Sequence, residues 1–179
     1  HYAYGSGYCI FNDLAVCARQ AITRWGRRRI CIIDLDVHQG DGTAAIFKDD
    51  PTVFTCSVHA ARNFPFHKQK SDLDVALPDG ITDDAYLAHL EAALDRIDFS
   101  AFDTLFYQAG VDPLQSDALG LLNLTRDGLA QRNQRIFDIH RQTGMPLVLF
   151  MGGGYAQPIS DTVDAFEDLF TMAAACSLA

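Results

Sequence analysis

The chain has 179 residues, 49% of them hydrophobic, and its formal net charge at pH 7 is −9. This size fits one domain with a single core, and the acidic charge argues against sequence-independent binding of nucleic acid, which needs a basic surface. The sequence has no run of roughly 20 apolar residues. Because its first residues also lack the basic start of a secretory signal, we expect a soluble, cytoplasmic protein without membrane contacts.

The N-terminal part predicts a helix followed by a strand. Apolar side chains recur at helical spacing over residues 14–25, behind the capping candidate Asn12 and ahead of Gly26, which would end the helix. Residues 30–33 are a continuous apolar run and predict a buried strand. The segment that follows this strand, DLDVHQGDG, is rich in acids and contains a histidine.

In the middle of the chain, residues 53–56 predict a second strand, which leads into Ser57 and His59. The connection over residues 59–81 is longer than the roughly 12–15 residues at which loops become uncommon, and such loops often build the rim of a site. Beyond Thr82, residues 87–97 predict another helix.

Two further apolar runs, residues 104–107 and 147–150, flank a helix predicted over residues 125–141. The first run leads to Asp112 and the second to three glycines and Tyr155. All four apolar runs are continuous rather than alternating, which is typical of parallel strands with helices on both faces of the sheet. The pattern therefore predicts an α/β layered fold.

Polar residues that follow these strands predict a metal site, because ligands of open parallel sheets bind outside the carboxyl ends of the strands. Asp36 and His38 are two residues apart, so at an extended strand end they would point the same way, with Asp112 as a third ligand. An isolated Asp-x-His pair is more often a solvated loop. Two carboxylates and one imidazole suit a catalytic zinc ion, and ferrous iron is the alternative metal that this ligand set allows.

Tyr155 could lie over a small polar ligand, because the three glycines before it allow unusual backbone angles. The alternative is a tight turn with a packed tyrosine. His59 either lines the site or is a hydrogen-bonded structural histidine. The other histidines in predicted helices and loops are expected at the surface: His67, His89 and His140.

Four segments, in this order, resemble the signature of the zinc-dependent histone deacetylase superfamily: GSGYCIFND, IIDLDVHQGDGTAAIF, YQAGVDPLQSDALG and MGGGY. That superfamily also holds acetylpolyamine amidohydrolases and acetoin-utilisation proteins. The details of DLDVHQGDG and NFPF resemble bacterial deacetylase-like proteins of the class IV type. The resemblance extends over nearly the whole chain and implies a three-layer arginase/deacetylase fold, of which residues 1–179 would be the C-terminal part.

Carried over to this sequence, the resemblance implies Zn²⁺ on Asp36, His38 and Asp112, with Tyr155 as hydrogen-bond donor to the developing oxyanion. It places four residues at an acyl-lysine substrate, and the two aromatic ones would be tunnel walls: Gly7, Tyr8, Phe64 and Gly153. Tyr8 departs from the phenylalanine that is usual there. A monovalent cation, K⁺, would have two side-chain ligands: Asp34 and Ser57.

The family's general base and acid are a tandem histidine pair, which would lie just upstream of His1. Asp34 and Asp41 match the carboxylates that orient those histidines, so they belong to the catalytic set but would stand without their partners. We therefore expect that this chain lacks the first part of its domain and is a poor deacetylase by itself.

The leading hypothesis is that the intact protein hydrolyses N-acyl amides, with acetyl-lysine in an acetylated protein as substrate, or a small acyl-amine such as an acetylpolyamine. An arginase-like two-metal hydrolase shares the fold and the Asp-x-His element, but it would carry a further Asp where this chain has Gly40. A catalytically silent module that binds acyl-lysine is the third hypothesis.

Overall fold

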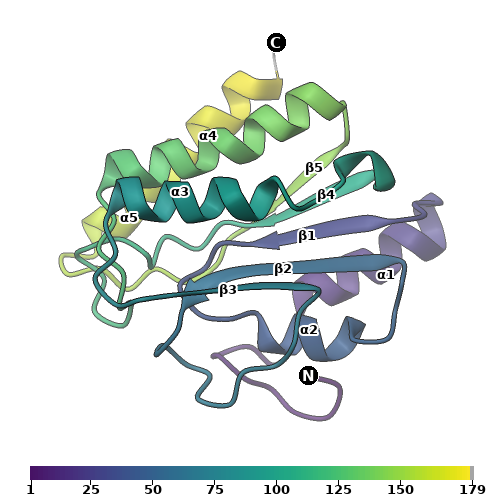
Figure 1. Ribbon diagram of the computed structural model, residues 1–179, viewed down its shortest axis with the longest axis horizontal. Coiled ribbons are helices and arrows are strands. Elements are labelled where there is room, and N and C mark those ends of the chain that lie inside the picture. Colours follow the sequence, from purple (N-terminus) through teal and green to yellow (C-terminus); the bar gives the residue numbers. More distant parts are fainter. Residues whose placement is uncertain (178–179) are drawn as a thin grey trace.

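The computed structural model describes residues 1–177, and within them five parallel strands form one sheet in the order β3-β2-β1-β4-β5 (Figure 1). The strands are β1 (Ile30–Asp34), β2 (Val53–Ala60), β3 (Leu73–Leu77), β4 (Thr104–Gln108) and β5 (Leu147–Phe150). The helices are α1 (Asp13–Trp25), α2 (Asp41–Phe47), α3 (Asp83–Leu94), α4 (Arg126–Thr143) and α5 (Ser160–Ser177), with one short 3₁₀ helix, η1 (Phe99–Ala101). None of the helices within residues 1–177 is both long and apolar enough to cross a membrane.

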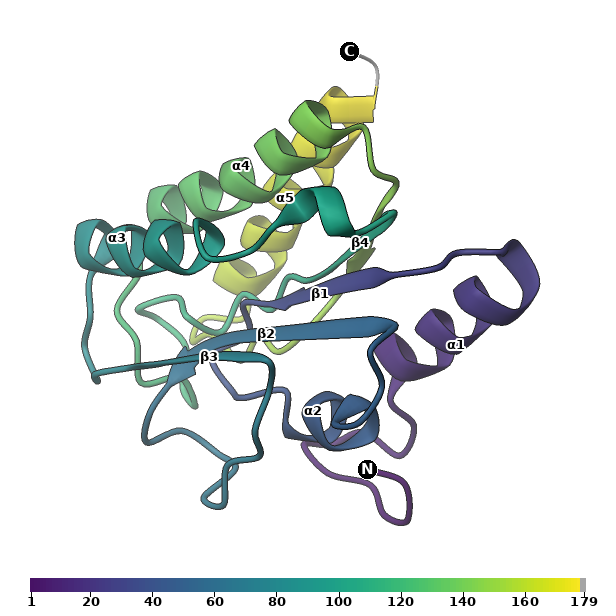
Figure 2. The same ribbon diagram turned by 45° about the vertical axis from the view of Figure 1, so that its right-hand side comes forward.

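Helices cover both faces of the sheet, as Figure 1 and Figure 2 show. On one face lie α3, α4 and α5, where Leu90, Ile136 and Leu169 belong to the larger cluster of buried apolar side chains. On the other face lie α1 and α2, where Ala18 and Phe47 belong to a smaller cluster. Removal of this apolar surface from water stabilises the layers. The three-layer arrangement confirms the predicted α/β fold.

β1 is the central strand, and its pairing aligns the strand ends that matter for function. All five of its residues are buried. Its last residue, Asp34, is paired with Ser57 of β2 and with Gln108 of β4. Because these strands run parallel, the segments that leave β1 and β4 begin side by side at the carboxyl edge of the sheet.

The three predicted helices are present in the structure, although α3 ends at Leu94 and not at Ile97. Asn12 caps α1 by accepting a hydrogen bond from the backbone N–H of Ala15. Gly26 and Gly144 end α1 and α4 with φ values of 68° and 67°, a left-handed conformation that glycine adopts without steric cost. α3 begins directly after Thr82.

The expectation of one long loop over residues 59–81 is wrong in part. β2 extends to Ala60, and β3 forms within this segment as an edge strand that is paired in parallel with β2. Leu73 and Leu77 are buried, whereas Asp74 between them is exposed. An edge strand with one solvated face does not show the continuous apolar run by which the other strands were predicted. Two helices, α2 and α5, were not predicted either.

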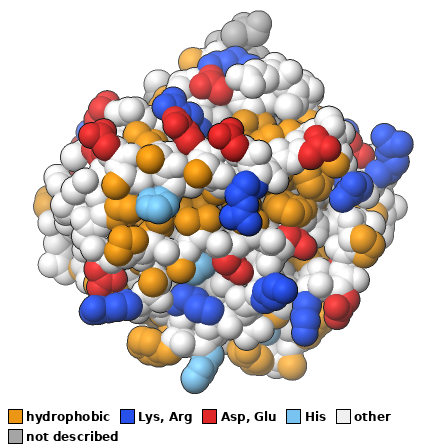
Figure 3. Space-filling view, in the orientation of Figure 1, with side chains coloured by type: hydrophobic (Ala, Val, Ile, Leu, Met, Phe, Trp, Pro, Cys, Tyr) orange, Lys and Arg blue, Asp and Glu red, His pale blue; other side chains and the backbone are white. Residues whose placement is uncertain are grey.

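The surface carries charges of both signs. On the face seen in Figure 3, lysine and arginine side chains lie scattered among acidic and apolar ones. Ion pairs of the structure include Arg62 with Asp79 and Arg126 with Asp168. A face of this kind lacks the continuous basic strip that a phosphate backbone requires.

Candidate metal centre

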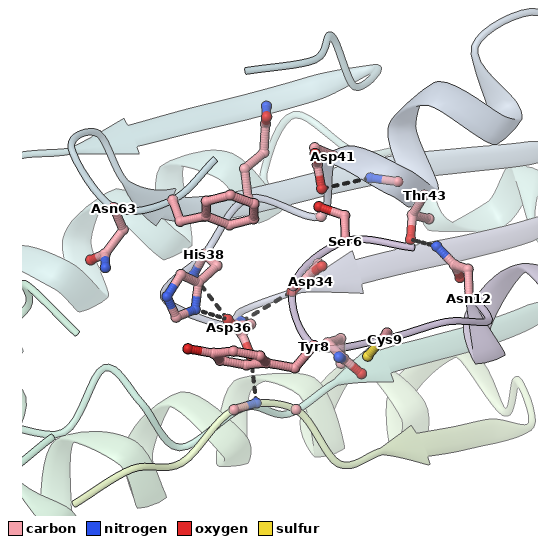
Figure 4. Close-up of a pocket in the computed structure, with 18 of the residues that line it drawn as sticks. Ser6, Tyr8, Cys9, Asn12, Asp34, Asp36, His38, Asp41, Thr43 and Asn63 are labelled. Atoms are coloured by element: carbon pink, nitrogen blue, oxygen red, sulfur yellow. Dashed lines mark hydrogen bonds and ion pairs between the residues drawn. The ribbon is translucent and has the colours of Figure 1, made fainter. Parts of the chain in front are cut away.

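Three polar side chains converge at the carboxyl edge of β1 and β4. Asp36 and His38 lie in the turn after β1, and Asp112 lies in the turn after β4. The Nδ1 atom of His38 is 2.9 Å from Oδ1 of Asp36 and 3.1 Å from Oδ2 of Asp112. Figure 4 shows the Asp36 and His38 side chains pointing toward each other. The structure thus brings together the three residues that the sequence named as ligands.

Burial and mutual hydrogen bonds shift the pKa values of these three groups. Burial by itself would lower the pKa of His38, but hydrogen bonds with Asp112 and Asp36 raise it to about 10. Burial raises the pKa of Asp112 to about 7, and the Asp36 carboxylate acts in the same direction. For Asp36, burial would raise the pKa, but the hydrogen bonds from His38 and Gly153 and the charge of His38 together lower it. The two carboxylates thus favour positive charge at this place.

Backbone N–H groups fix the orientation of both carboxylates. Oδ1 of Asp112 accepts a hydrogen bond from the N–H of Val37 at 2.8 Å, and Oδ2 of Asp36 accepts one from the N–H of Gly153 at 2.7 Å. The other oxygen of each carboxylate faces the imidazole of His38. Three chain segments, after β1, β4 and β5, are tied together in this way. Such partners orient metal ligands in proteins.

The glycines before Tyr155 are needed for close approach, not for unusual backbone angles. A Cβ atom at Gly153 would collide with Oδ2 of Asp112, and one at Gly152 would lie 2.6 Å from Oδ2 of Asp36. Neither glycine has a positive φ. The expected reason for these glycines is therefore wrong. Only a hydrogen atom fits where the backbone passes the two carboxylates.

The donor set fits a catalytic divalent metal ion. Nδ1 or Nε2 of His38 and one oxygen each from Asp36 and Asp112 lie within 4.8 Å of one another. Three protein ligands with further positions open are typical of catalytic zinc, and ferrous iron accepts a similar set of nitrogen and oxygen donors. Within residues 1–177 this is the only such group of three or more His, Cys, Asp or Glu side chains. The arrangement therefore fits one ion rather than two.

Tyr155 is held beside these donors by its backbone. Its N–H donates a hydrogen bond to Oδ2 of Asp117 at 2.6 Å, and its carbonyl oxygen accepts one from the N–H of Ala118 at 3.1 Å. Burial raises the pKa of the phenol, and the carboxylates of Asp112 and Asp36 act in the same direction. The phenol therefore stays protonated at neutral pH and can donate a hydrogen bond to a ligand.

Asp36, His38 and Tyr155 line a cavity of about 730 Å³, a volume within the usual range for small-molecule sites. Figure 4 looks into this cavity. Its walls include the four residues that the resemblance placed at the substrate, which are Gly7, Tyr8, Phe64 and Gly153. The rings of Tyr8 and Tyr155 meet edge-on with their centroids 6.0 Å apart.

Tyr8 lies in a tight turn with a strained backbone. Ser6 and Cys9 exchange two backbone hydrogen bonds of 3.0 Å, and Gly7 and Tyr8 between them have φ values of 55° and 64°. A positive φ is uncommon at a bulky residue, and strain of this kind clusters at binding and catalytic sites. The turn holds the Tyr8 ring at the mouth of the cavity, although 86% of the residue is exposed.

Asp34 and Asp41 lie next to the three donors. Asp34 is 6% exposed, and its Oδ1 accepts a hydrogen bond from the N–H of Asp36 at 3.1 Å. Burial and the neighbouring Asp36 carboxylate raise its pKa. Oδ2 of Asp41 is 2.9 Å from Nε2 of His1. The imidazole of His1 also lines the cavity, but His1 is not one of the tandem histidines that the resemblance pairs with Asp34 and Asp41.

His59 is a buried structural histidine. It is 1% exposed, its Nδ1 is 3.0 Å from Oγ of Ser57, and it does not line the cavity. Burial lowers its pKa. The hydrogen-bonded structural alternative is the one that the structure supports. His67 and His89 are exposed as expected, whereas His140 is half-buried.

Sequence reasoning missed two residues that support the site. Asp117 accepts hydrogen bonds from the backbone N–H groups of Leu119 and Gly120 as well as Tyr155. An aspartate ahead of a turn glycine is a signal that could have indicated this local role. Arg132 is fully buried on α4. It carries no comparable signal, because an arginine on a helix normally reaches solvent.

Residues 1–167 match the model of the histone deacetylase domain. Histone deacetylase 2 of Arabidopsis thaliana is 34% identical over 168 residues, which cover 89% of this chain and 43% of that protein. An uncharacterized protein of Picosynechococcus sp. is 50% identical over 164 residues, which cover 89% of this chain and 54% of that protein. The chain thus spans about half the length of these curated relatives.

Solved structures share the fold. An HDAC homolog complexed with SAHA superposes with a TM-score of 0.78 and 27% identity, over 93% of this chain and 46% of that one. An acetylpolyamine aminohydrolase from Burkholderia pseudomallei superposes with a TM-score of 0.78 and 23% identity, over 93% of this chain and 50% of that one. At 23% identity, the likeness to the acetylpolyamine aminohydrolase concerns the fold alone.

Proposed function

Because the chain belongs to the histone deacetylase domain family, we propose that it serves the zinc-dependent hydrolysis of N-acyl amides, with acetyl-lysine in proteins as the main substrate. The observation that carries this proposal is the convergence of Asp36, His38 and the buried Asp112 beside the Tyr155 phenol, at a cavity that Asp36, His38 and Tyr155 line. A metal ion and a phenol on the same carbonyl group form a site aimed at an oxyanion.

Zinc would be held by the imidazole of His38 and by one carboxylate oxygen each of Asp36 and Asp112. When bound, such an ion polarises a carbonyl group and lowers the pKa of a water molecule. The two carboxylates favour a divalent cation by their charge. The N–H groups of Val37 and Gly153 keep them oriented, so little rearrangement is needed for binding.

Tyr155 would act on the carbonyl oxygen of the substrate. Water attacks the carbonyl carbon, negative charge develops on the oxygen, and the O–H of Tyr155 donates a hydrogen bond to that oxygen. This contact accelerates the reaction because it is stronger in the transition state than with the neutral amide. The C–N bond then breaks, and the nitrogen leaves as a free amine after accepting a proton, with acetate as the other product.

The proton transfers require a base and an acid near the attacking water. The family resemblance assigns them to a histidine pair upstream of His1, oriented by Asp34 and Asp41. The resemblance also implies a K⁺ ion with Asp34 and Ser57 as side-chain ligands. These two residues are register partners on β1 and β2.

Two aromatic residues in the walls of the cavity suit a substrate whose amide lies at the end of an alkyl chain. Tyr8 and Phe64 present aromatic surface that an alkyl chain could contact, while the carbonyl group reaches the metal centre. An acetylated lysine side chain has this shape. An acetylpolyamine shares it, and one structural neighbour is an acetylpolyamine aminohydrolase, so a small acyl-amine is the alternative substrate class.

The test measures acetate release from an acetyl-lysine peptide and from acetylputrescine. The zinc-loaded protein is assayed as the 179-residue chain and in a version extended upstream to the length of its relatives. We expect the extended version to hydrolyse the peptide faster than the polyamine, with activity lost on chelation and restored by zinc. Faster hydrolysis of acetylputrescine would reassign the substrate class. Binding of both compounds without any release would support a silent binding module instead.

A further inference from the structure

Helix α4 carries a fully buried arginine behind the candidate metal centre. Arg132 exposes 0% of its surface. Its Nη1 donates hydrogen bonds to the backbone carbonyl oxygens of Gly110 at 2.7 Å and Leu35 at 3.1 Å. Its Nε and Nη2 donate to Oδ1 of Asn133 at 3.2 Å and 3.0 Å. Every nitrogen of the guanidinium group therefore has an acceptor.

The two carbonyl groups belong to the segments that carry the proposed metal ligands. Leu35 directly precedes Asp36, and Gly110 lies two residues before Asp112. Both carbonyl groups lie beyond the last paired residues of β1 and β4. Arg132 thus bridges the two segments close to the point where the sheet's regular pairing stops.

We propose that Arg132 is a positioning residue for the metal centre. Its guanidinium group fixes the separation of the Leu35 and Gly110 carbonyl groups, and this in turn sets the separation of the two carboxylate ligands. The role rests on the proposed metal site. It acts through the backbone, because Arg132 does not line the cavity.

The acceptors of Arg132 argue for a role beyond stability. A buried charge is costly, and a buried arginine usually has a carboxylate partner. Here the acceptors are backbone carbonyl oxygens and one amide oxygen, which also accepts the hydroxyl hydrogen of Tyr107 at 2.6 Å. An apolar side chain of similar size would often serve stability equally well. An apolar side chain could not donate hydrogen bonds to both carbonyl groups, as the planar guanidinium group of Arg132 does.

The test compares Zn²⁺ affinity, the absorption spectrum of the Co²⁺-loaded chain and thermal unfolding for Arg132→Met, Arg132→Lys and the unchanged chain. Co²⁺ is used because its visible spectrum responds to ligand geometry. Ile136→Val is the matched control, since Ile136 is also buried on α4 but its apolar side chain cannot donate a hydrogen bond to the two carbonyl groups. We expect Arg132→Met to weaken Zn²⁺ binding by roughly 10–100-fold and to change the Co²⁺ spectrum. Arg132→Lys should fall between, and Ile136→Val should leave both readouts unchanged.

Unchanged affinity and an unchanged Co²⁺ spectrum in Arg132→Met would overturn the role of Arg132. An equal loss in Ile136→Val would overturn it too, because the effect would then follow general stability. If Arg132→Met does not fold, the same readouts in Arg132→Lys decide. Asp112→Ala separates the two proposals. If Asp112→Ala still binds Zn²⁺ tightly, the metal site is wrong and the role of Arg132 falls with it. If only Asp112→Ala loses binding, the metal site stands and the role of Arg132 is overturned.

Discussion

The floor of the cavity and its mouth are built in opposite ways. At the floor, Asp36 is 8% exposed and Asp112 behind it is 0% exposed, and each accepts a hydrogen bond from the backbone. At the mouth, Tyr8 and Phe66 are 86% and 85% exposed and lie on segments outside the sheet. The difference teaches that the proposed chemistry depends on strand ends whose positions the sheet fixes. Substrate recognition would depend on loops, which can vary without disturbing the proposed chemistry at the strand ends.

The largest effect should follow from removing a floor residue. Asp112→Ala takes away one proposed ligand and leaves the N–H of Val37 without its buried acceptor. We expect zinc binding to weaken by more than the roughly 10–100-fold that follows loss of an outer partner of a metal ligand, and turnover to fall to background. The measurement is metal content after zinc loading, which should be one ion per unchanged chain. Undiminished binding in the variant, or two ions in the unchanged chain, would contradict the single site.

A smaller effect is expected from Tyr155→Phe, which removes only a hydroxyl group. Loss of one oxyanion donor typically lowers turnover by about 10²–10³, and we expect that loss in kcat with zinc content intact. The measurement is turnover of an acetyl-lysine peptide by the version extended upstream, at matched zinc occupancy. Asp112→Ala is the contrasting variant, because it should lose both activity and metal. Near-normal hydrolysis by Tyr155→Phe would remove the phenol from the mechanism.

The floor could be predicted from the sequence because its residues directly follow continuous apolar runs. β1 and β4 are buried on both faces, so their ends were easy to locate, and Asp36, His38 and Asp112 come shortly after them. The spacing of Asp36 and His38 and the parallel arrangement of strands then brought the three together. The family resemblance added the role of Tyr155 toward the oxyanion and the substrate residues Gly7, Tyr8, Phe64 and Gly153, but not Phe66.

The rest of the site depends on contacts that no local pattern encodes. Arg132 lies within α4 at a position that looks like an ordinary helix surface, and its role depends on carbonyl groups far away in the sequence. Gly152 and Gly153 were noticed, but for the wrong reason, because the carboxylates that crowd them come from β1 and β4. Asp117 was also missed, although its turn carries a recognisable pattern.

The smallest effect should come from the mouth, and it should appear in KM rather than in kcat. The ring of Phe66 meets that of Phe64 edge-on at 6.3 Å and lines the cavity while 85% of the residue is exposed. Phe66→Ala removes aromatic contact area, which is worth about 0.5–1.5 kcal/mol per ring pair beyond simple burial, so KM should rise by at most about tenfold. Zinc content and kcat should stay unchanged, because no backbone donor of the floor comes from this loop.

Trp25→Ala is the control, since Trp25 is 70% exposed at the end of α1 and does not line the cavity. Peptide kinetics and metal analysis on both variants provide the measurement. A loss of zinc or a large fall in kcat in Phe66→Ala alone would show that mouth and floor are coupled, and the division between a fixed floor and a variable mouth would then be wrong.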